Sequence, residues 1–138
     1  MNPVQRLIKD NNDTDKLVSS CVTEFMNASI AFHKLHLKIS GPGSFAAHKA
    51  LNKLYEELQE HADTLAEGYQ GATQKLLSYT ANSPRDLNSV NDGISYTKEI
   101  ATMITDLQKN LTYSEIINDL DSVKSTLNSA RYKLTFLK

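Results

Sequence analysis

Hydrophobic residues recur along most of the chain at steps of three and four positions, which is the spacing of one buried face of an α-helix. Apart from Pro3, the glycines and prolines that interrupt helices cluster at 41–43, at 68 and 71, and within 82–93. The pattern therefore predicts long helices between these breaks. They span about residues 14–40, 44–71, 94–107 and 112–137.

Local signals mark several of the expected helix ends. Gly41-Pro42 stops the first helix, and the Ser44 hydroxyl can cap the second. Thr112 and Glu115 match a capping box at the start of the last helix. Ser83-Pro84-Arg85-Asp86 is typical of a helix start with proline in the first turn. We therefore expect a short helix in the connection between the second and third helices.

Four amphipathic helices without a strand pattern favour an all-α fold, a four-helix bundle. A length of 138 residues suits one domain with a useful buried core. We expect this domain to span residues 1–138, with residues 1–13 as a short N-terminal arm.

Composition narrows the possible partners and the location. Fifteen Lys and Arg nearly balance 16 Asp and Glu, so DNA binding by bulk charge is disfavoured. No apolar run approaches the roughly 20 residues of a membrane helix, and residues 1–14 lack the apolar core of a secretory signal. We expect a soluble cytoplasmic protein. Its single cysteine, Cys21, lies at helical spacing among apolar residues, which predicts a buried thiol.

Polar residues that could bind a metal gather on the first two predicted helices. His36 lies six residues before Pro42 and His48 six after it, so a hairpin at 41–43 would bring the two imidazoles level. Asp63 and Glu67 are four residues apart, hence neighbours on one helix face, where two carboxylates can bind one cation.

The two pairs are too far apart along the second helix to form one site within a chain. The fifteen residues from His48 to Asp63 span about 22 Å of helix. Two chains that pack these helices antiparallel about a two-fold axis would place His48 of one copy beside Asp63 and Glu67 of the other. The spacing therefore favours a homo-oligomer that contains at least a two-fold dimer.

The segment from His33 to His48, followed by Tyr55 and by Asp63-Thr-Leu-Ala-Glu67, closely resembles the signature of the Dps miniferritins. The resemblance implies a ferritin-like bundle with an inter-subunit ferroxidase site, in which His36 and His48 of one subunit face Asp63 and Glu67 of its partner. It also implies oxidation of Fe(II), typically by hydrogen peroxide, and storage of ferric mineral in a shell of twelve subunits. Zinc or manganese would fit the same ligands.

Two positions depart from the family pattern. Leu37 stands where a tryptophan is usual, and Gly68 stands where an arginine commonly follows the glutamate. Both changes leave the four ligands intact and alter their surroundings. His33, one turn from His36, is either an accessory metal ligand or a structural residue.

Other functions are compatible with the same residues. Taken singly, His36 or His48 is more typical of a hydrogen-bonded or surface histidine than of a metal ligand. Taken alone, Asp63 and Glu67 are more typical of the solvated face of a helix. The alternative function is a ferritin-like structural or interaction protein that lacks ferroxidase turnover. A DNA-compacting shell is disfavoured further, because neither end of the chain is strongly basic.

Overall fold

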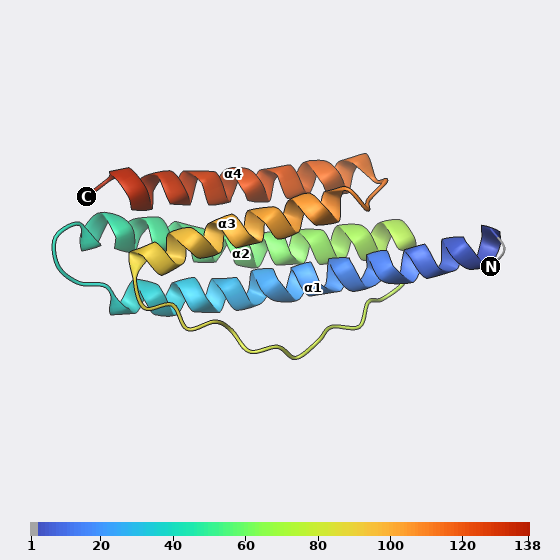
Figure 1. Cartoon of the computed structure of the whole chain (residues 1–138), viewed down its shortest axis with the longest axis horizontal. Coiled ribbons are helices and arrows are strands. Elements are labelled where there is room, and N and C mark those ends of the chain that lie inside the picture. The colour runs from blue at the N-terminus through green and yellow to red at the C-terminus, as the bar shows by residue number, and fades with distance from the viewer. Residues whose placement is uncertain (1–2) are drawn as a thin grey trace.

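The computed structural model describes residues 3–138, with side chains from residue 13 onward. Its helices are α1 (Pro3–Lys38), α2 (Ser44–Thr73), α3 (Val90–Gln108) and α4 (Ser114–Phe136). They pack side by side into an elongated bundle, and the described residues contain no strand (Figure 1). The predicted all-helical four-helix bundle is confirmed. The side chains of the predicted N-terminal arm, except that of Asp13, lie outside the described residues.

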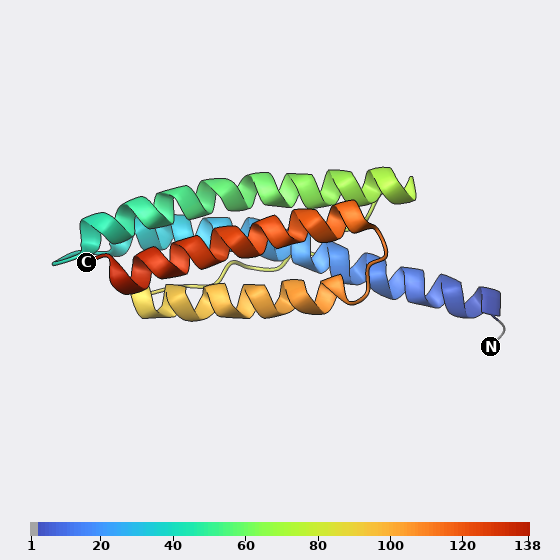
Figure 2. The same ribbon diagram turned by 90° about the horizontal axis from the view of Figure 1, so that it is seen from above.

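The helices are connected by two short turns and one long crossover. Helices α1 and α2 form an antiparallel hairpin, residues 74–89 return along the length of the bundle, and α3 and α4 form a second hairpin (Figures 1 and 2). Helix α1 packs against α2 and α3, and α4 packs against the same two helices. Because of the crossover, α2 and α3 run in the same direction.

The buried face of each helix carries the apolar residues that the sequence pattern predicted. Leu35, Leu51, Leu58, Ile104 and Leu120 are at most 1% exposed in a continuous hydrophobic core. Complete burial of such a side chain contributes roughly 1.5–3 kcal/mol to stability. Within the described part of the chain, no helix has an apolar stretch long enough to cross a membrane.

The predicted short helix in the connection is wrong, because residues 74–89 contain no helix. These 16 residues lead back to the start of α3, a helix of 19 residues that rises about 28 Å. The segment is instead anchored by the buried side chain of Leu87 and by the Asn82 carbonyl, which accepts from Asn27 Nδ2 at 2.9 Å.

Two predicted helix caps are also wrong. The N-cap of α2 is Gly43, without a side-chain hydrogen bond, and Ser44 is the first helical residue. The last helix begins two residues after Thr112, with Tyr113 as N-cap and no side-chain cap. Because Leu111 is buried, packing fixes the chain in this turn and sets where the helix begins.

Helix α3 begins before the predicted position, at Val90, and has a side-chain cap. The Ser89 Oγ accepts from the Asp92 amide at 3.1 Å, and Asp92 Oδ2 accepts from the Asn88 amide at 3.0 Å. This reciprocal cap satisfies two backbone donors that would otherwise lack a partner at the helix start.

Candidate functional site

The candidate site begins at the tight turn between α1 and α2. Gly41 has φ 90° and Gly43 has φ 82°, in the left-handed region that glycine adopts without a steric penalty. The Ser44 amide donates to the Gly41 carbonyl at 3.1 Å and closes the turn. The last turn of α1 therefore lies beside the first turns of α2.

This turn brings His36 and His48 together, as the sequence spacing predicts. Their ring centroids are 3.8 Å apart and the ring planes differ by 24°. The coordinating lone pair of an imidazole lies in the ring plane. Two stacked, nearly parallel rings therefore present their nitrogens side by side, so in this arrangement they do not form a chelate around one ion.

A backbone hydrogen bond orients the His48 ring. His48 Nδ1 lies 3.1 Å from the His36 carbonyl oxygen. A carbonyl can only accept, so Nδ1 carries the proton and Nε2 keeps a free lone pair in the neutral ring. A hydrogen bond from one ring nitrogen to a carbonyl is how metal-binding histidines are commonly oriented. His48 itself is an exposed residue.

His36 is buried and electrically neutral at physiological pH. Its side chain is 8% exposed, and Nδ1 has no hydrogen-bond partner among the described residues. Burial lowers the pKa of His36 below its usual value of 6.5, and the adjacent His48 lowers it further. A neutral imidazole is the form that binds metal ions.

His33 packs against α2 next to this pair. Its ring stacks on Tyr55 at 4.0 Å with an interplanar angle of 6°, and lies 5.7 Å from the His36 ring. The Ser29 hydroxyl donates to the Tyr55 carbonyl at 2.7 Å, which ties the same two helices together. His33 thus has a clear packing role, and its ring is exposed on one side.

Asp63 and Glu67 lie far from the histidines on the same helix. Both are exposed, and neither forms a hydrogen bond or ion pair with a described residue. Within the described part of one chain, no three His, Cys, Asp or Glu side chains are close enough to hold a metal ion. One chain thus carries a histidine half (His36 and His48) and a separate carboxylate half (Asp63 and Glu67).

His61, the fourth histidine of the chain, packs toward α4. It is half-buried, and its Nε2 lies 3.0 Å from the Thr126 hydroxyl on α4. Burial lowers the pKa of His61 against the opposing effect of nearby carboxylates. The residue joins α2 to α4 rather than lying on the solvent face that carries Asp63.

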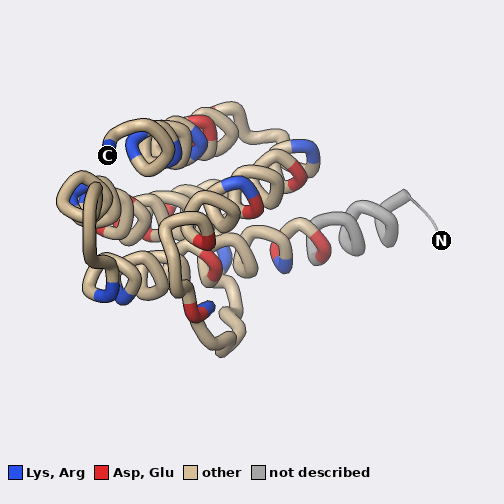
Figure 3. Tube along the Cα trace, turned by 60° about the vertical axis from the view of Figure 1, so that its left-hand side comes forward, with Lys and Arg blue, Asp and Glu red and all other residues tan. Residues whose placement is uncertain are grey.

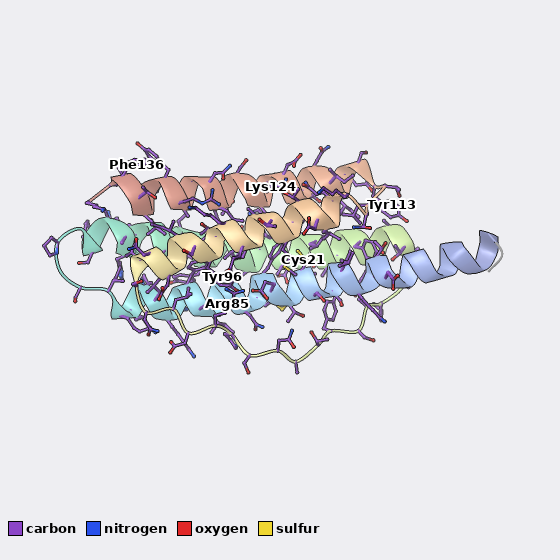
Figure 4. All side chains as sticks on the ribbon, viewed as in Figure 1. Cys21, Arg85, Tyr96, Tyr113, Lys124 and Phe136 are labelled. Atoms are coloured by element: carbon purple, nitrogen blue, oxygen red, sulfur yellow. The ribbon has the colours of Figure 1, made fainter. Side chains whose placement is uncertain are left out.

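Cys21 is the buried thiol that the sequence predicts. Its side chain is fully buried inside the bundle (Figure 4), and burial raises the pKa of the thiol to about 12. The thiol therefore stays protonated at physiological pH and contributes no thiolate ligand.

A polar cluster beneath the crossover was missed by the sequence analysis. The Tyr96 hydroxyl donates to Glu24 Oε1, while Arg85 pairs with Glu99 and lies 4.4 Å from the Tyr96 ring centroid (Figure 4). Burial raises the pKa of Tyr96. The only sequence signal was Glu24 beside the apolar stripe of α1. The cluster fastens the crossover to α1 and α3.

Charged residues of both signs are spread over the described helices (Figure 3), in keeping with a net charge of -1. In comparisons with known proteins, a family model described as a family of unknown function, DUF5856, matches residues 36–134. The match begins at His36 and includes both halves of the candidate site. No curated protein and no solved structure matches the chain.

Proposed function

The chain belongs to the DUF5856 family of unknown function, and from its own residues we propose a Dps-like protein that oxidises Fe(II) at sites shared between two copies. The observation that carries the proposal is the histidine half. Its two imidazole rings are held together by the α1–α2 turn, and the hydrogen bond from His48 Nδ1 leaves Nε2 free to bind a cation.

The carboxylate half supports a shared site. Asp63 and Glu67 are exposed, adjacent on one helix face and without a partner among the described residues. An antiparallel two-fold pairing of α2 brings them to the histidines of a second copy and forms the site twice. A single long crossover between the second and third helices is also the connectivity of ferritin-like bundles, which supports the proposed fold family.

The mixed ligand set suits iron as a substrate. Carboxylate oxygens favour Fe(III), and neutral imidazoles bind Fe(II) without adding charge. Two Fe(II) ions each give one electron to hydrogen peroxide, which takes up two protons and leaves as two water molecules. In this proposal Glu67 bridges, Asp63 completes the oxygen side, and His36 and His48 supply nitrogen. Zinc or manganese would bind the same donors.

The proposal extends to assembly and location. By the same resemblance we place the protein in the cytoplasm and expect the dimers to assemble into a shell of twelve subunits that stores the ferric product. Light scattering of the purified protein measures the size of the assembly directly.

A complementation experiment tests whether the site is shared. His48→Ala and Glu67→Ala should each abolish fast Fe(II) oxidation by peroxide. In a mixed dimer, however, one of the two sites pairs the intact histidines of the second variant with the intact carboxylates of the first. Co-expression of the two variants in equal amounts should therefore restore about one quarter of the parental rate by random pairing.

Each outcome has a defined meaning. A site contained within one chain predicts no rescue, because each variant then lacks a ligand at every site. Equal oxidation rates in the parent and both variants would remove the ferroxidase proposal. If the parent protein purifies without metal and neither binds nor oxidises added iron, the result supports the alternative, a ferritin-like structural or interaction protein without turnover.

A further inference from the structure

A stripe of exposed residues runs along the outer side of α2 at helical spacing, opposite the core. We call this the outer stripe. Its members are separated by steps of three and four positions, and all are exposed except the half-buried Asn52. They are Phe45, Lys49, Asn52, Glu56, Gln59, Asp63 and Glu67. An open groove of about 520 Å³ follows its first half, beside His48.

The charge changes sign along this stripe. From Ser44 to Tyr55, the first residues of α2, the charged residues are Lys49 and Lys53, and both line the groove together with Glu56. From position 56 onward the helix carries five carboxylates, Glu56, Glu57, Glu60, Asp63 and Glu67, and no Lys or Arg. A helix whose basic residues all precede position 56 and whose acidic residues all follow from there is complementary to an antiparallel copy of itself and repels a parallel copy.

These charges are largely unpaired within one chain. Lys49 lies 4.8 Å above the Phe45 ring, and Lys53 makes only a long, exposed contact of 3.9 Å with Glu57. Glu60 forms no hydrogen bond or ion pair with any described residue. Exposed pairs of this kind contribute little, so both lysines and Glu60 are available to another molecule.

We propose that the outer stripe, together with the exposed Lys53 and Glu60 beside it, recognises a second copy of this chain through these opposite charges. The register rests on the proposed function, because it is set by placing His48 opposite Asp63 and Glu67. That register puts Lys53 opposite Glu60 of the second copy. It puts Lys49 opposite position 64, next to Asp63 of the second copy. Each contact occurs twice about the two-fold axis.

The same register brings the two copies of Glu56 together near the axis. Within one chain, Asn52 Nδ2 donates to Glu56 Oε1 at 3.2 Å, which partly satisfies this carboxylate. The two like charges still repel across the interface. Glu56 is therefore the one acidic member of the outer stripe whose removal should tighten the dimer.

An apolar stripe on α1 borders the charged one. Its members are Met26, Ile30 and Leu37, which are 46%, 42% and 70% exposed. They lie on the same side of α1 as His33, at steps of three and four positions, and the His33 ring stacks on Tyr55 of α2. With Phe45, which is 71% exposed, they add apolar area to the same face. The face thus combines hydrophobic area with charges that set its orientation, as specific interfaces do.

Charge reversal of residues outside the proposed iron site tests the inference. The variants are Lys53→Glu, Glu60→Lys and the double variant, with Lys98→Glu on α3 as a matched control. Sedimentation in the presence of a chelator, at low and high ionic strength, measures the distribution between single chains and larger assemblies, and so the apparent dissociation constant of the two-fold contact. Each single reversal should raise it about 10-fold at low salt, and the double variant should restore it. Glu56→Gln should lower it several-fold, and Lys98→Glu should leave it unchanged.

The inference and the proposed function fail in different ways. The charge inference is overturned if the single reversals match the parent, or if the double variant does not recover. If the protein oxidises iron and the two inactive variants complement each other, but the charge reversals leave the dissociation constant unchanged, the charge inference alone is contradicted. A dimer that responds as expected but oxidises no iron contradicts the proposed function alone. Thermal melting of each variant confirms that the exposed substitutions leave the fold intact.

Discussion

The histidine half and the carboxylate half of the candidate site are built in different ways. His36 is buried between helices, and its ring stacks on that of His48, which is fixed by a backbone hydrogen bond. Asp63 and Glu67 stand exposed on α2 and have no hydrogen bond or ion pair among the described residues. One half is therefore positioned by the fold, and the other is free to be positioned by a ligand or a second copy.

Because of this difference, substitutions in the two halves should affect the free energy of unfolding to different extents. Removing a buried side chain leaves a cavity and costs stability, whatever its role in binding. Removing an exposed, unpartnered carboxylate usually changes the free energy of unfolding by less than about 0.5 kcal/mol. Variants in the two halves should consequently look alike in iron oxidation and different in unfolding.

The largest expected effect is the loss of iron oxidation in Asp63→Asn. The amide keeps the shape of the carboxylate but loses its charge, so we expect the initial rate of Fe(II) oxidation to fall by roughly 100-fold. The free energy of unfolding, measured by urea denaturation, should stay within about 0.5 kcal/mol of the parent.

The paired variant His36→Ala should lose the same activity and also about 2 kcal/mol of stability, because its ring fills space between α1 and α2. If Asp63→Asn is as destabilising as His36→Ala, the carboxylate half is part of the folded structure and the contrast between the halves is wrong.

The second prediction concerns the turn that aligns the histidines. Gly43→Ala should cost about 1.5 kcal/mol, because φ is 82° there and the new Cβ would lie 3.3 Å from the Lys138 Cα. Gly41→Ala should cost about 1 kcal/mol, since φ is 90° but the surrounding space is open. Both should slow iron oxidation by disturbing the alignment of His36 and His48.

Gly71→Ala is the matched control for these substitutions. Gly71 lies within α2, has no positive φ and has nothing within 4 Å of the new Cβ, so alanine should stabilise the chain by about 0.5 kcal/mol. Thermal melts of the three variants compare them directly. A destabilised Gly71→Ala, or an unaffected Gly43→Ala, would contradict this account of the turn.

Local rules predicted the parts of the fold that depend on neighbouring residues. Helical spacing identified the four helices, and the Gly-Pro-Gly turn indicated that His36 and His48 lie level, because both follow from residues close in sequence. The same reasoning failed for Ser83-Pro84, whose helix-start signal is overridden by contacts with distant residues, through the buried Leu87 and the Asn82 carbonyl.

Long-range contacts were beyond the sequence pattern. Tyr96 and Glu24 are 72 residues apart, and nothing local to either indicates that they form a hydrogen bond. The proposed contact between the two site halves depends on the surfaces of two molecules, which the local pattern of one chain does not encode.

The smallest expected effect is a dependence of stability on pH that belongs to the histidine half alone. Burial and the neighbouring His48 lower the pKa of His36 in the folded chain, whereas the unfolded chain titrates near 6.5. As pH falls below about 6.5, the unfolded state takes up a proton that the folded state does not, so stability decreases, by at most about 1.4 kcal/mol per pH unit. Urea denaturation between pH 5 and 8, with a chelator present, should show this loss, and His36→Gln should reduce the slope. His61, whose pKa is lowered in the same direction, supplies the part of the slope that remains, so an unchanged slope in His36→Gln would mean that His36 is not kept neutral by its burial.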